Sequence, residues 1–355
     1  MRKYKLFSTV LVGLLALSLV GCGAQKQTAP APAPGGNTAA PAQTAQAAKD
    51  FFKGKTMTII VPYSVGGGFD KVARLVAPGL EKELGVTAVV KNEPGAGGLL
   101  GANDINNAKP DGLTIGILNV PGMIYNKLLD EPNAKFDLDK MSWVGRATAE
   151  ARALVVGKKS TFTSVDDFVK ANRPIKVAIT GKGSDDYFAA ILEAKAFGYK
   201  LDPVTGYDGG QEANLGAARG DTDATQNTTS SVMSGVTNGD LKPILQIGDK
   251  KSSDLPNVPL ASDVVKPEGK EYLAIVSNII ALDRSFAAPP GVPADRLKVL
   301  SDSLVKVLQD PDVKANAGKS KIPLSPLGSE DTSKLVKDVF QKSSSVKQLL
   351  KDSMK

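Results

Sequence analysis

Short apolar runs alternate with amphipathic stretches from about residue 53 to the C-terminus. The run at residues 57–61 is rich in β-branched residues and is followed by Pro62 and by glycines at 66–68, which predicts a buried strand that ends in a turn. Over residues 70–84 the apolar positions recur at helical spacing and predict a helix, with Pro78 expected to kink or shorten it.

The alternation continues with strands predicted at 86–90 and 114–118 and a helix predicted at 98–107. A strand–helix–strand–helix–strand order is typical of a parallel sheet with helices on its faces. This part of the chain therefore predicts an α/β domain.

A second series of the same kind follows, and 355 residues are enough for two domains. Its predicted strands are 153–156, 176–180, 222–225 and 242–247, and its predicted helices are 165–171, 186–197 and 210–219. A β-rich stretch is expected at 272–282, where the chain would return to the first domain, and two amphipathic helices are expected at 294–308 and 332–350.

The N-terminus has the features of a secretory signal. Arg2, Lys3 and Lys5 precede an apolar run at 6–20 that is short for a membrane span, and the run leads to Cys22, the only cysteine of the chain. This segment resembles a bacterial lipoprotein signal. We expect the first 21 residues (1–21) to be a lipoprotein signal peptide and Cys22 to be lipidated, the alternative being a stray thiol in an ordinary signal.

The segment 22–52 is dominated, between 23 and 49, by Ala, Pro, Gln, Thr and Gly. Such a composition has little to bury and predicts a disordered or extended tether. The folded part is expected to begin near Lys53.

The composition excludes several kinds of chemistry. The chain has no histidine, which excludes Ser-His-Asp catalysis, histidine metal ligands and histidine general bases. A single cysteine cannot form a disulfide within the chain. The net charge of +7 falls to +4 without the three basic residues of 1–21, and the remaining basic residues are scattered, so nucleic-acid binding is not expected.

Glycines 66–68 lie between a predicted strand and a predicted helix. Glycines at such a place let backbone N–H groups approach a ligand, and the N-terminal end of a helix attracts an anion. Ser64 would add a hydroxyl group. Alternatively the glycines only make the turn, and Asp70 is an ordinary first-turn carboxylate.

A second glycine loop, residues 181–184, also follows a predicted strand and precedes a predicted helix. The two loops, one in each domain, could face each other across a cleft and hold the same carboxylate, or they could be unrelated turns. A third turn, at 206–210, places Tyr207 in a cleft wall or in the core. The glycines at 95–101 do not have dinucleotide-binding spacing, and 181–184 is not a Walker motif.

Several short motifs occur in an order that is typical of one protein family. They are Ile60-Val61-Pro62, Gly66-Gly67-Gly68-Phe69-Asp70, Ala73-Arg74, Asn92-Glu93-Pro94-Gly95-Ala96-Gly97-Gly98, Pro110-Asp111-Gly112, Gly181-Lys182-Gly183-Ser184, Tyr207-Asp208-Gly209, Gly220-Asp221-Thr222-Asp223, Leu255-Pro256-Asn257-Val258-Pro259 and Ala288-Pro289-Pro290-Gly291-Val292-Pro293. With them, the chain from about Lys53 onwards resembles the Bug or TctC family, the extracytoplasmic receptors of tripartite tricarboxylate transporters.

The resemblance implies a two-lobed periplasmic-binding-protein (Venus flytrap) fold of the α/β class with a central ligand cleft. Lobe 1 would comprise 53–152 plus 283–355, and lobe 2 would comprise 153–282. In the family, loops that follow two strands hold a ligand carboxylate, partly through water. The substrate-binding residues carried over on this basis are Tyr63, Ser64, Val65, Gly66, Gly67, Gly68, Asp70, Gly183, Ser184, Tyr187, Tyr207, Gly209 and Asn227.

The chain departs from the family pattern at some of these positions. Phe69 stands where a small hydroxyl residue is frequent, and Tyr187 stands where a histidine is frequent. Residues 225–228 offer no acid for an amino group, so a di- or tricarboxylate or an aromatic acid is favoured over an amino acid as the ligand. Arg146 and Arg152 are alternative direct partners for a carboxylate.

The sequence therefore predicts a solute-binding lipoprotein outside the cytoplasm, anchored to the cell membrane through Cys22. It would capture a small carboxylate and deliver it to the integral-membrane subunits of a tripartite tricarboxylate transporter. We expect a monomer without enzymatic activity, metal or cofactor. The alternatives are a ligand sensor that signals through a membrane partner and an enzyme on a similar scaffold.

Overall fold

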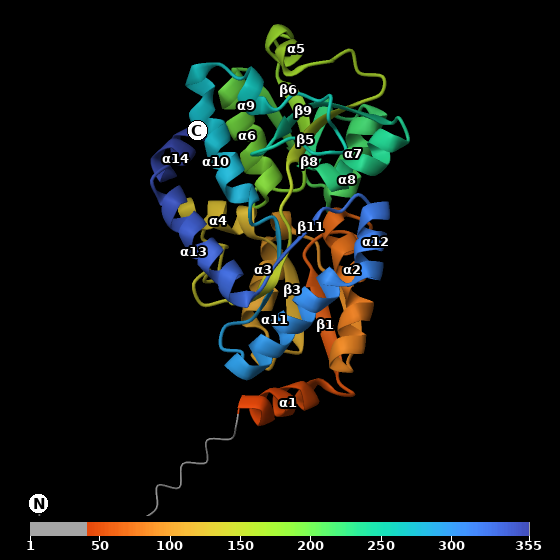
Figure 1. The fold of residues 1–355 in the computed structure, drawn as a ribbon. Coiled ribbons are helices and arrows are strands. Elements are labelled where there is room, and N and C mark those ends of the chain that lie inside the picture. Colours follow the sequence, from red (N-terminus) through yellow and green to blue (C-terminus); the bar gives the residue numbers. More distant parts are fainter. Residues whose placement is uncertain (1–40, 355) are drawn as a thin grey trace, which may run out of the picture. The chain divides into compact units, whose positions relative to one another are not determined.

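The computed structural model describes residues 41–354 (Figure 1). The predicted signal peptide, Cys22 and the first part of the predicted tether lie outside the described residues. Among residues 41–354, none of the helices combines the length and the hydrophobicity that a membrane span requires.

Two mixed sheets organise the described chain. The first sheet has six strands in the order β11-β4-β10-β3-β1-β2. In it, β1 pairs in parallel with β2 and β3, whereas β10 runs antiparallel between β3 and β4. Its strands are β1 (Thr56–Val61), β2 (Thr87–Asn92), β3 (Thr114–Asn119), β4 (Ser142–Thr148), β10 (Arg284–Ala288) and β11 (Leu324–Leu327).

The second sheet has five strands in the order β7-β6-β8-β5-β9. Here β6 pairs in parallel with β7 and β8, and β5 runs antiparallel between β8 and β9. Its strands are β5 (Arg152–Gly157), β6 (Ile175–Ile179), β7 (Leu201–Thr205), β8 (Ala224–Thr228) and β9 (Leu241–Ile247).

Helices lie between most of the strands (Figure 1). They are α1 (Pro41–Phe52), α2 (Gly68–Leu84), α3 (Leu99–Asn107), α4 (Val120–Leu128), α5 (Val165–Lys170), α6 (Asp185–Phe197), α7 (Gly210–Arg219), α8 (Thr229–Thr237), α9 (Ala261–Val264), α10 (Lys270–Ile280), α11 (Ala294–Gln309), α12 (Pro311–Lys319), α13 (Ser329–Ser344) and α14 (Lys347–Ser353), with single 3₁₀ turns at Ala96–Gly98 and Pro267–Gly269. The α/β fold class and the predicted strand–helix alternation are confirmed.

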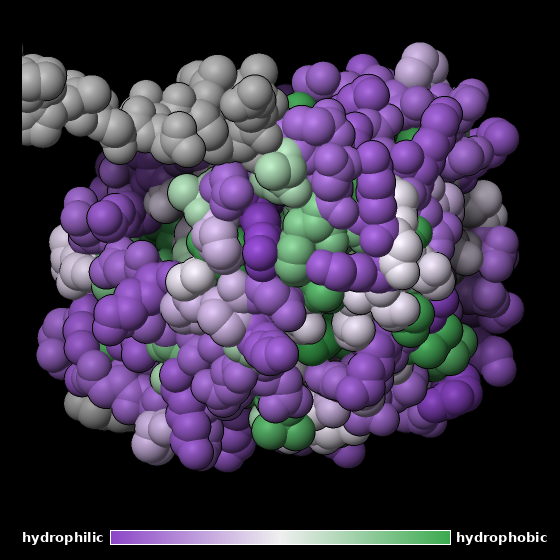
Figure 2. Space-filling view, turned by 90° about the horizontal axis from the view of Figure 1, so that it is seen from below, coloured by the Kyte–Doolittle hydropathy of each residue, from purple (hydrophilic) through white to green (hydrophobic). Residues whose placement is uncertain are grey.

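The chain crosses from one sheet to the other twice, at 149–151 between β4 and β5 and at 281–283 between α10 and β10. A single apolar cluster contains residues of both sheets, and α4 packs on α6 within it, where the rings of Tyr125 and Phe188 lie 4.8 Å apart. The surface shown in Figure 2 is mainly hydrophilic, with small separate apolar patches.

Two predictions near the C-terminus are wrong. Residues 272–282 are not a β-rich stretch, because most of them belong to helix α10, which buries Leu273, Val276 and Ile280 at helical spacing. Burial of that apolar face outweighs the strand propensity of its β-branched residues. The crossing strand is β10 instead.

The predicted helix at 332–350 is two helices, α13 and α14. Serine hydroxyl groups at the break donate hydrogen bonds to backbone carbonyl groups, from Ser344 to Phe340 over 3.0 Å and from Ser345 to Lys342 over 2.7 Å. Such bonds compete with the regular helical pattern and favour a helix end.

The structure also differs from the expected tether at its C-terminal end, because residues 41–52 form helix α1. Phe52 is completely buried in the apolar cluster beneath α2 and α11, and Ala48 is buried as well. Phe51 lies under the guanidinium of Arg296, 3.4 Å from its ring centroid. Two adjacent phenylalanines therefore hold this helix against the folded part, although its composition resembles that of the tether.

Removing the Phe52 side chain tests this attachment. Phe52→Ala should lower the free energy of unfolding by about 3–5 kcal/mol, because it leaves a cavity at a fully buried site. Urea denaturation measures the change. Phe51→Ala is the matched control and should cost less, since Phe51 is only partly buried. Equal and small effects of both changes would show that α1 does not pack on the domain.

Candidate functional site

A cavity of about 30 Å³ lies between the two sheets, where several strands of each sheet begin or end. It has room for about one or two water molecules, which is less than an organic acid occupies. The residues that line it are Tyr63, Gly67, Gly68, Phe69, Asn119, Arg152, Thr180, Asp185, Asp186, Gly210, Asn227, Thr228, Ser231, Asp283 and Arg284.

The first glycine loop brings the N-terminus of α2 to this cavity. Gly67 is the N-cap residue, and its φ of −72° is one that any residue can adopt. Gly68 must be glycine for another reason, because a Cβ atom there would overlap the guanidinium of Arg284 and the hydroxyl of Ser231. The first N–H groups of α2 have no partner within the helix, and they lie beside the cavity.

Asp70 fixes the loop from outside the cavity. Its carboxylate accepts hydrogen bonds from the N–H of Gly66 over 2.9 Å, from Nε of Arg74 over 2.9 Å and from Nδ2 of Asn92 over 3.0 Å. Burial by itself raises the pKa of Asp70, but these donors hold it below its ordinary value. Asp70 therefore shapes the loop, whose Gly66 has a φ of +83°.

The residues before the glycines have different environments. Tyr63 lines the cavity, stacks on Phe69 at 4.6 Å, and accepts a hydrogen bond from Nδ2 of Asn119 over 2.8 Å. Ser64 and Val65 are not in the lining. The N–H of Ser64 donates to the carbonyl of Asp208 over 2.9 Å, which links the two sheets' loops, and Val65 is 64% exposed.

The second glycine loop does not place its hydroxyl in the cavity. Ser184 is buried, and its Oγ donates to the carbonyl of Gly181 over 2.7 Å and also contacts Asp186. Tyr187 packs edge-on against Phe188 at 5.5 Å and is likewise not in the lining. The cavity takes Asp185 and Asp186 from this segment instead.

Of the third loop, residues 206–210, the two predicted site residues do not line the cavity. Tyr207 packs on Gly216 of α7, and Gly209 packs against Ser64, so neither lines the cavity. Asn227, at the end of β8, does line it and donates a hydrogen bond to Oδ1 of Asn214 over 2.9 Å. Of the predicted site residues, the structure brings Tyr63, Gly67, Gly68 and Asn227 together around the cavity.

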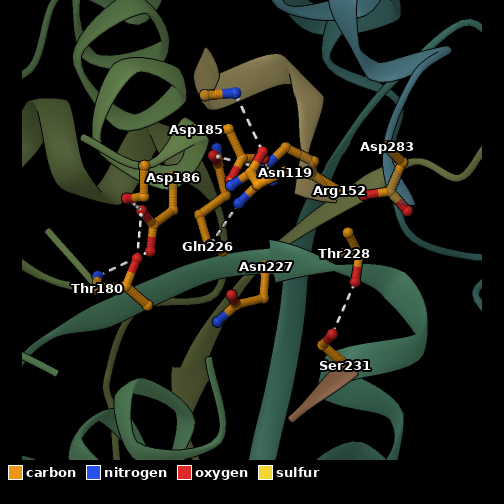
Figure 3. Close-up of polar contacts among 12 residues, drawn as sticks. Asn119, Arg152, Thr180, Asp185, Asp186, Gln226, Asn227, Thr228, Ser231 and Asp283 are labelled. Atoms are coloured by element: carbon orange, nitrogen blue, oxygen red, sulfur yellow. Dashed lines mark hydrogen bonds and ion pairs between the residues drawn. The ribbon is translucent and has the colours of Figure 1, made fainter. Parts of the chain in front are cut away.

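Two buried arginines also line the cavity: Arg152, which the sequence suggested as an alternative carboxylate partner, and Arg284, which it did not. Arg152 forms an ion pair with Asp185 and donates to the side chain and backbone carbonyl of Gln226 over 3.2 and 2.9 Å (Figure 3). Arg146, the other arginine suggested as a carboxylate partner, does not line the cavity. Its guanidinium donates hydrogen bonds to the backbone carbonyl groups of Ser325 and Ala281.

Arg284 is the second of these arginines and is almost fully buried. It forms an ion pair with Glu150, and its Nη2 donates to the hydroxyl groups of Thr228 over 2.6 Å and Ser231 over 3.0 Å. Thr228 and Ser231 also bond to each other over 2.7 Å (Figure 3). Nothing near Arg284 in the sequence marks it, since its partners come from distant segments.

Burial changes the acidity of two lining carboxyl groups. Burial, together with the nearby carboxylate of Asp185, raises the pKa of Asp186 to about 7. Burial also raises the pKa of Asp283 to about 7, although Arg284 opposes the rise. Two carboxyl groups with strongly raised pKa values therefore line the cavity.

The comparisons with known proteins agree with this architecture. Residues 72–351 match the family described as "Tripartite tricarboxylate transporter family receptor", TctC. The chain belongs to this family. The resemblance inferred from the motifs is confirmed, and the family is one of solute-binding receptors.

Individual relatives and solved structures are similar to this chain. A curated relative from Agrobacterium vitis, "UPF0065 protein in the TAR-I ttuE-ttuC' intergenic region", is 28% identical over 272 residues, 75% of each chain. The structure of the periplasmic binding protein BugD superposes with a TM-score of 0.74 at 22% identity and covers 84% of this chain and 97% of BugD. MatC from Rhodopseudomonas palustris with bound malate gives 0.71 at 21% identity and covers 82% and 99%. These structures establish the two-lobed binding-protein fold for the TctC-family chain.

The second glycine loop packs against the glycines at 95–98 rather than against the first loop. A Cβ atom at Gly181 would lie 2.7 Å from the backbone nitrogen of Gly97 and 3.0 Å from its Cα. Nδ2 of Asn126 also donates to the carbonyl of Gly183 over 2.7 Å, across the same contact. The absence of side chains is thus what lets the two backbones meet.

Gly181→Ala tests this contact. Gly181 does not have a positive φ, so alanine fits the loop itself but pushes the two backbones apart. We expect solution scattering of the protein without ligand to give a larger radius of gyration than wild type. Gly318→Ala, at an exposed helical site with open space around it, should leave the radius unchanged. An unchanged radius in Gly181→Ala would mean that the contact does not persist in solution.

Proposed function

We propose that this TctC-family receptor captures a small carboxylate outside the cytoplasm and delivers it to the membrane subunits of a tripartite tricarboxylate transporter. The observation that carries the proposal is the cavity between the sheets, with the N-terminus of α2 on one side and two arginines in its lining. Unpartnered N–H groups at a helix N-terminus attract an anion. The malate in MatC, a protein of the same fold, supports a carboxylate ligand.

The fold supports capture by closure of two lobes. We place the lobes at 53–152 plus 283–355 and at 153–282, in keeping with the two crossings of the chain. Hydrogen bonds between the lobes, such as Asn119 to Asp185 over 2.6 Å, would break when they open. A cavity of about 30 Å³ is smaller than an organic acid, so in this proposal the lobes separate before the ligand enters.

Gly67→Val tests the α2 site without disturbing the fold. A Cβ at Gly67 would meet only the carbonyl oxygen of Ser64, at 3.6 Å, and φ is unstrained, so the valine side chain fills the cavity without backbone strain. A bound acid at 100 times its Kd should stabilise wild type by about 2.7 kcal/mol. A thermal-shift screen of organic acids should show that Gly67→Val loses this response at an unchanged ligand-free Tm.

Gly318→Val, on the surface of α12, is the matched control and should keep the response. If the Gly67→Val protein responds to the same acids as wild type, the α2 terminus does not hold the ligand. If wild type responds to no acid, the proposed function is wrong.

The proposed anchor is tested separately. If Cys22 carries lipid, Cys22→Ser should move the protein from the membrane fraction to the soluble fraction, because stable anchoring requires acyl chains. Cell fractionation with immunoblotting measures the distribution. Retention of the variant in the membrane fraction would contradict lipidation at Cys22.

A further inference from the structure

Acidic groups outnumber basic groups around a cavity that is proposed to receive an acid. The guanidinium groups of Arg152 and Arg284 line it together with the carboxyl groups of Asp185, Asp186 and Asp283. Glu150 adds another carboxyl group in contact with Arg284. A site for a di- or tricarboxylate would instead require more basic than acidic groups.

The chain's own acids already match both guanidinium groups. Arg152 pairs with Asp185, and Arg284 pairs with Glu150 and lies 3.5 Å from Asp283. Among the described residues that line the cavity, every guanidinium group therefore has a carboxylate partner. A ligand carboxylate cannot bind either one without competing with an internal ion pair.

The N-terminus of α2 offers a place for one carboxylate. Gly67, Gly68 and Phe69 line the cavity there. The nearby carboxylate of Asp70 faces away, since it is held by Arg74 and Asn92. This end of the cavity therefore offers backbone donors, and the first-turn acid of α2, Asp70, does not line it.

The other side of the cavity presents Asp185. Its side chain is 15% exposed, whereas Asp186 and Asp283 are almost fully buried. Asp186 is occupied by the N–H and hydroxyl of Thr180, at 2.9 and 3.0 Å. Asp185 also has partners, Arg152 and Asn119, but it is the most exposed of the three carboxyl groups and thus the one that a ligand reaches most easily.

We infer that the ligand is a zwitterion, with one carboxylate at the N-terminus of α2 and one ammonium group that Asp185 binds. This inference rests on the proposed function and specifies its ligand class. A second ligand carboxylate beside Asp185 would bury like charges together when the lobes close, and a buried charge without a partner is strongly unfavourable. An ammonium group beside Asp185 instead brings no further negative charge to this side of the cavity.

Pairs of ligands that exchange an ammonium for a carboxylate test the inference on the wild-type protein. Isothermal titration calorimetry compares γ-aminobutyrate with glutarate, and p-(aminomethyl)benzoate with p-(carboxymethyl)benzoate. At least one amino compound should bind about tenfold or more tightly than its dicarboxylate, as expected for one charge-assisted hydrogen bond.

The outcomes separate the two proposals. If a dicarboxylate binds as tightly as its amino partner or more tightly, the zwitterion inference is wrong and the carboxylate receptor stands. If these compounds and the wider acid screen give no binding at all, the proposed function fails and the inference fails with it.

Asp185→Asn assigns the selectivity to one residue. The amino compound should lose roughly tenfold to a hundredfold in affinity, while the dicarboxylate should gain because Arg152 loses its internal partner. The ratio of the two affinities is the readout, since a merely structural effect would weaken both. Asp166→Asn, an exposed first-turn aspartate of α5, is the matched control and should leave the ratio unchanged. An unchanged ratio in folded Asp185→Asn would overturn the role of Asp185.

Discussion

The guanidinium of Arg284 is buried where the chain returns from one sheet to the other. Much of the site is built from the groups that neutralise and hydrogen-bond this charge. Glu150 reaches it from the first crossing, and hydroxyl groups reach it from the end of β8 and the start of α8. A buried charge is tolerated only when such partners surround it. The pairing therefore ties both crossings and both sheets to one arrangement.

The same guanidinium determines how α2 begins. Its Nη2 occupies the position that a side chain at residue 68 would need, so only glycine lets the first turn of α2 approach. The helix N-terminus is brought to the cavity by this contact. The place of the proposed anion site is thus linked to how an internal charge is accommodated.

Close backbone contact recurs on the other side of the cavity, between glycines 95–98 and the loop at 181–184. The first of these stretches lacks the spacing of a nucleotide-binding motif, and the structure gives its glycines a packing role. Together with the Asn119–Asp185 and Asn126–Gly183 hydrogen bonds, this contact means that the closed arrangement has stabilising interactions of its own. A ligand would add to them rather than supply all of them.

Local pattern determined the elements and the family of this protein. Strand β1 follows from a short run of β-branched residues that ends at proline and glycine, and helix α11 follows from the helical spacing of its apolar residues. The local pattern gave the wrong secondary structure for α10 and α1. Both segments are helical because of the surfaces against which they pack. The glycine loops were visible in the sequence, yet only the tertiary structure showed that Ser184 and Tyr187 stand outside the cavity lining. The sequence suggested Arg152 as an alternative partner for a carboxylate, but it did not predict Asp185 or Arg284. These three residues meet only after the chain has crossed between the sheets twice.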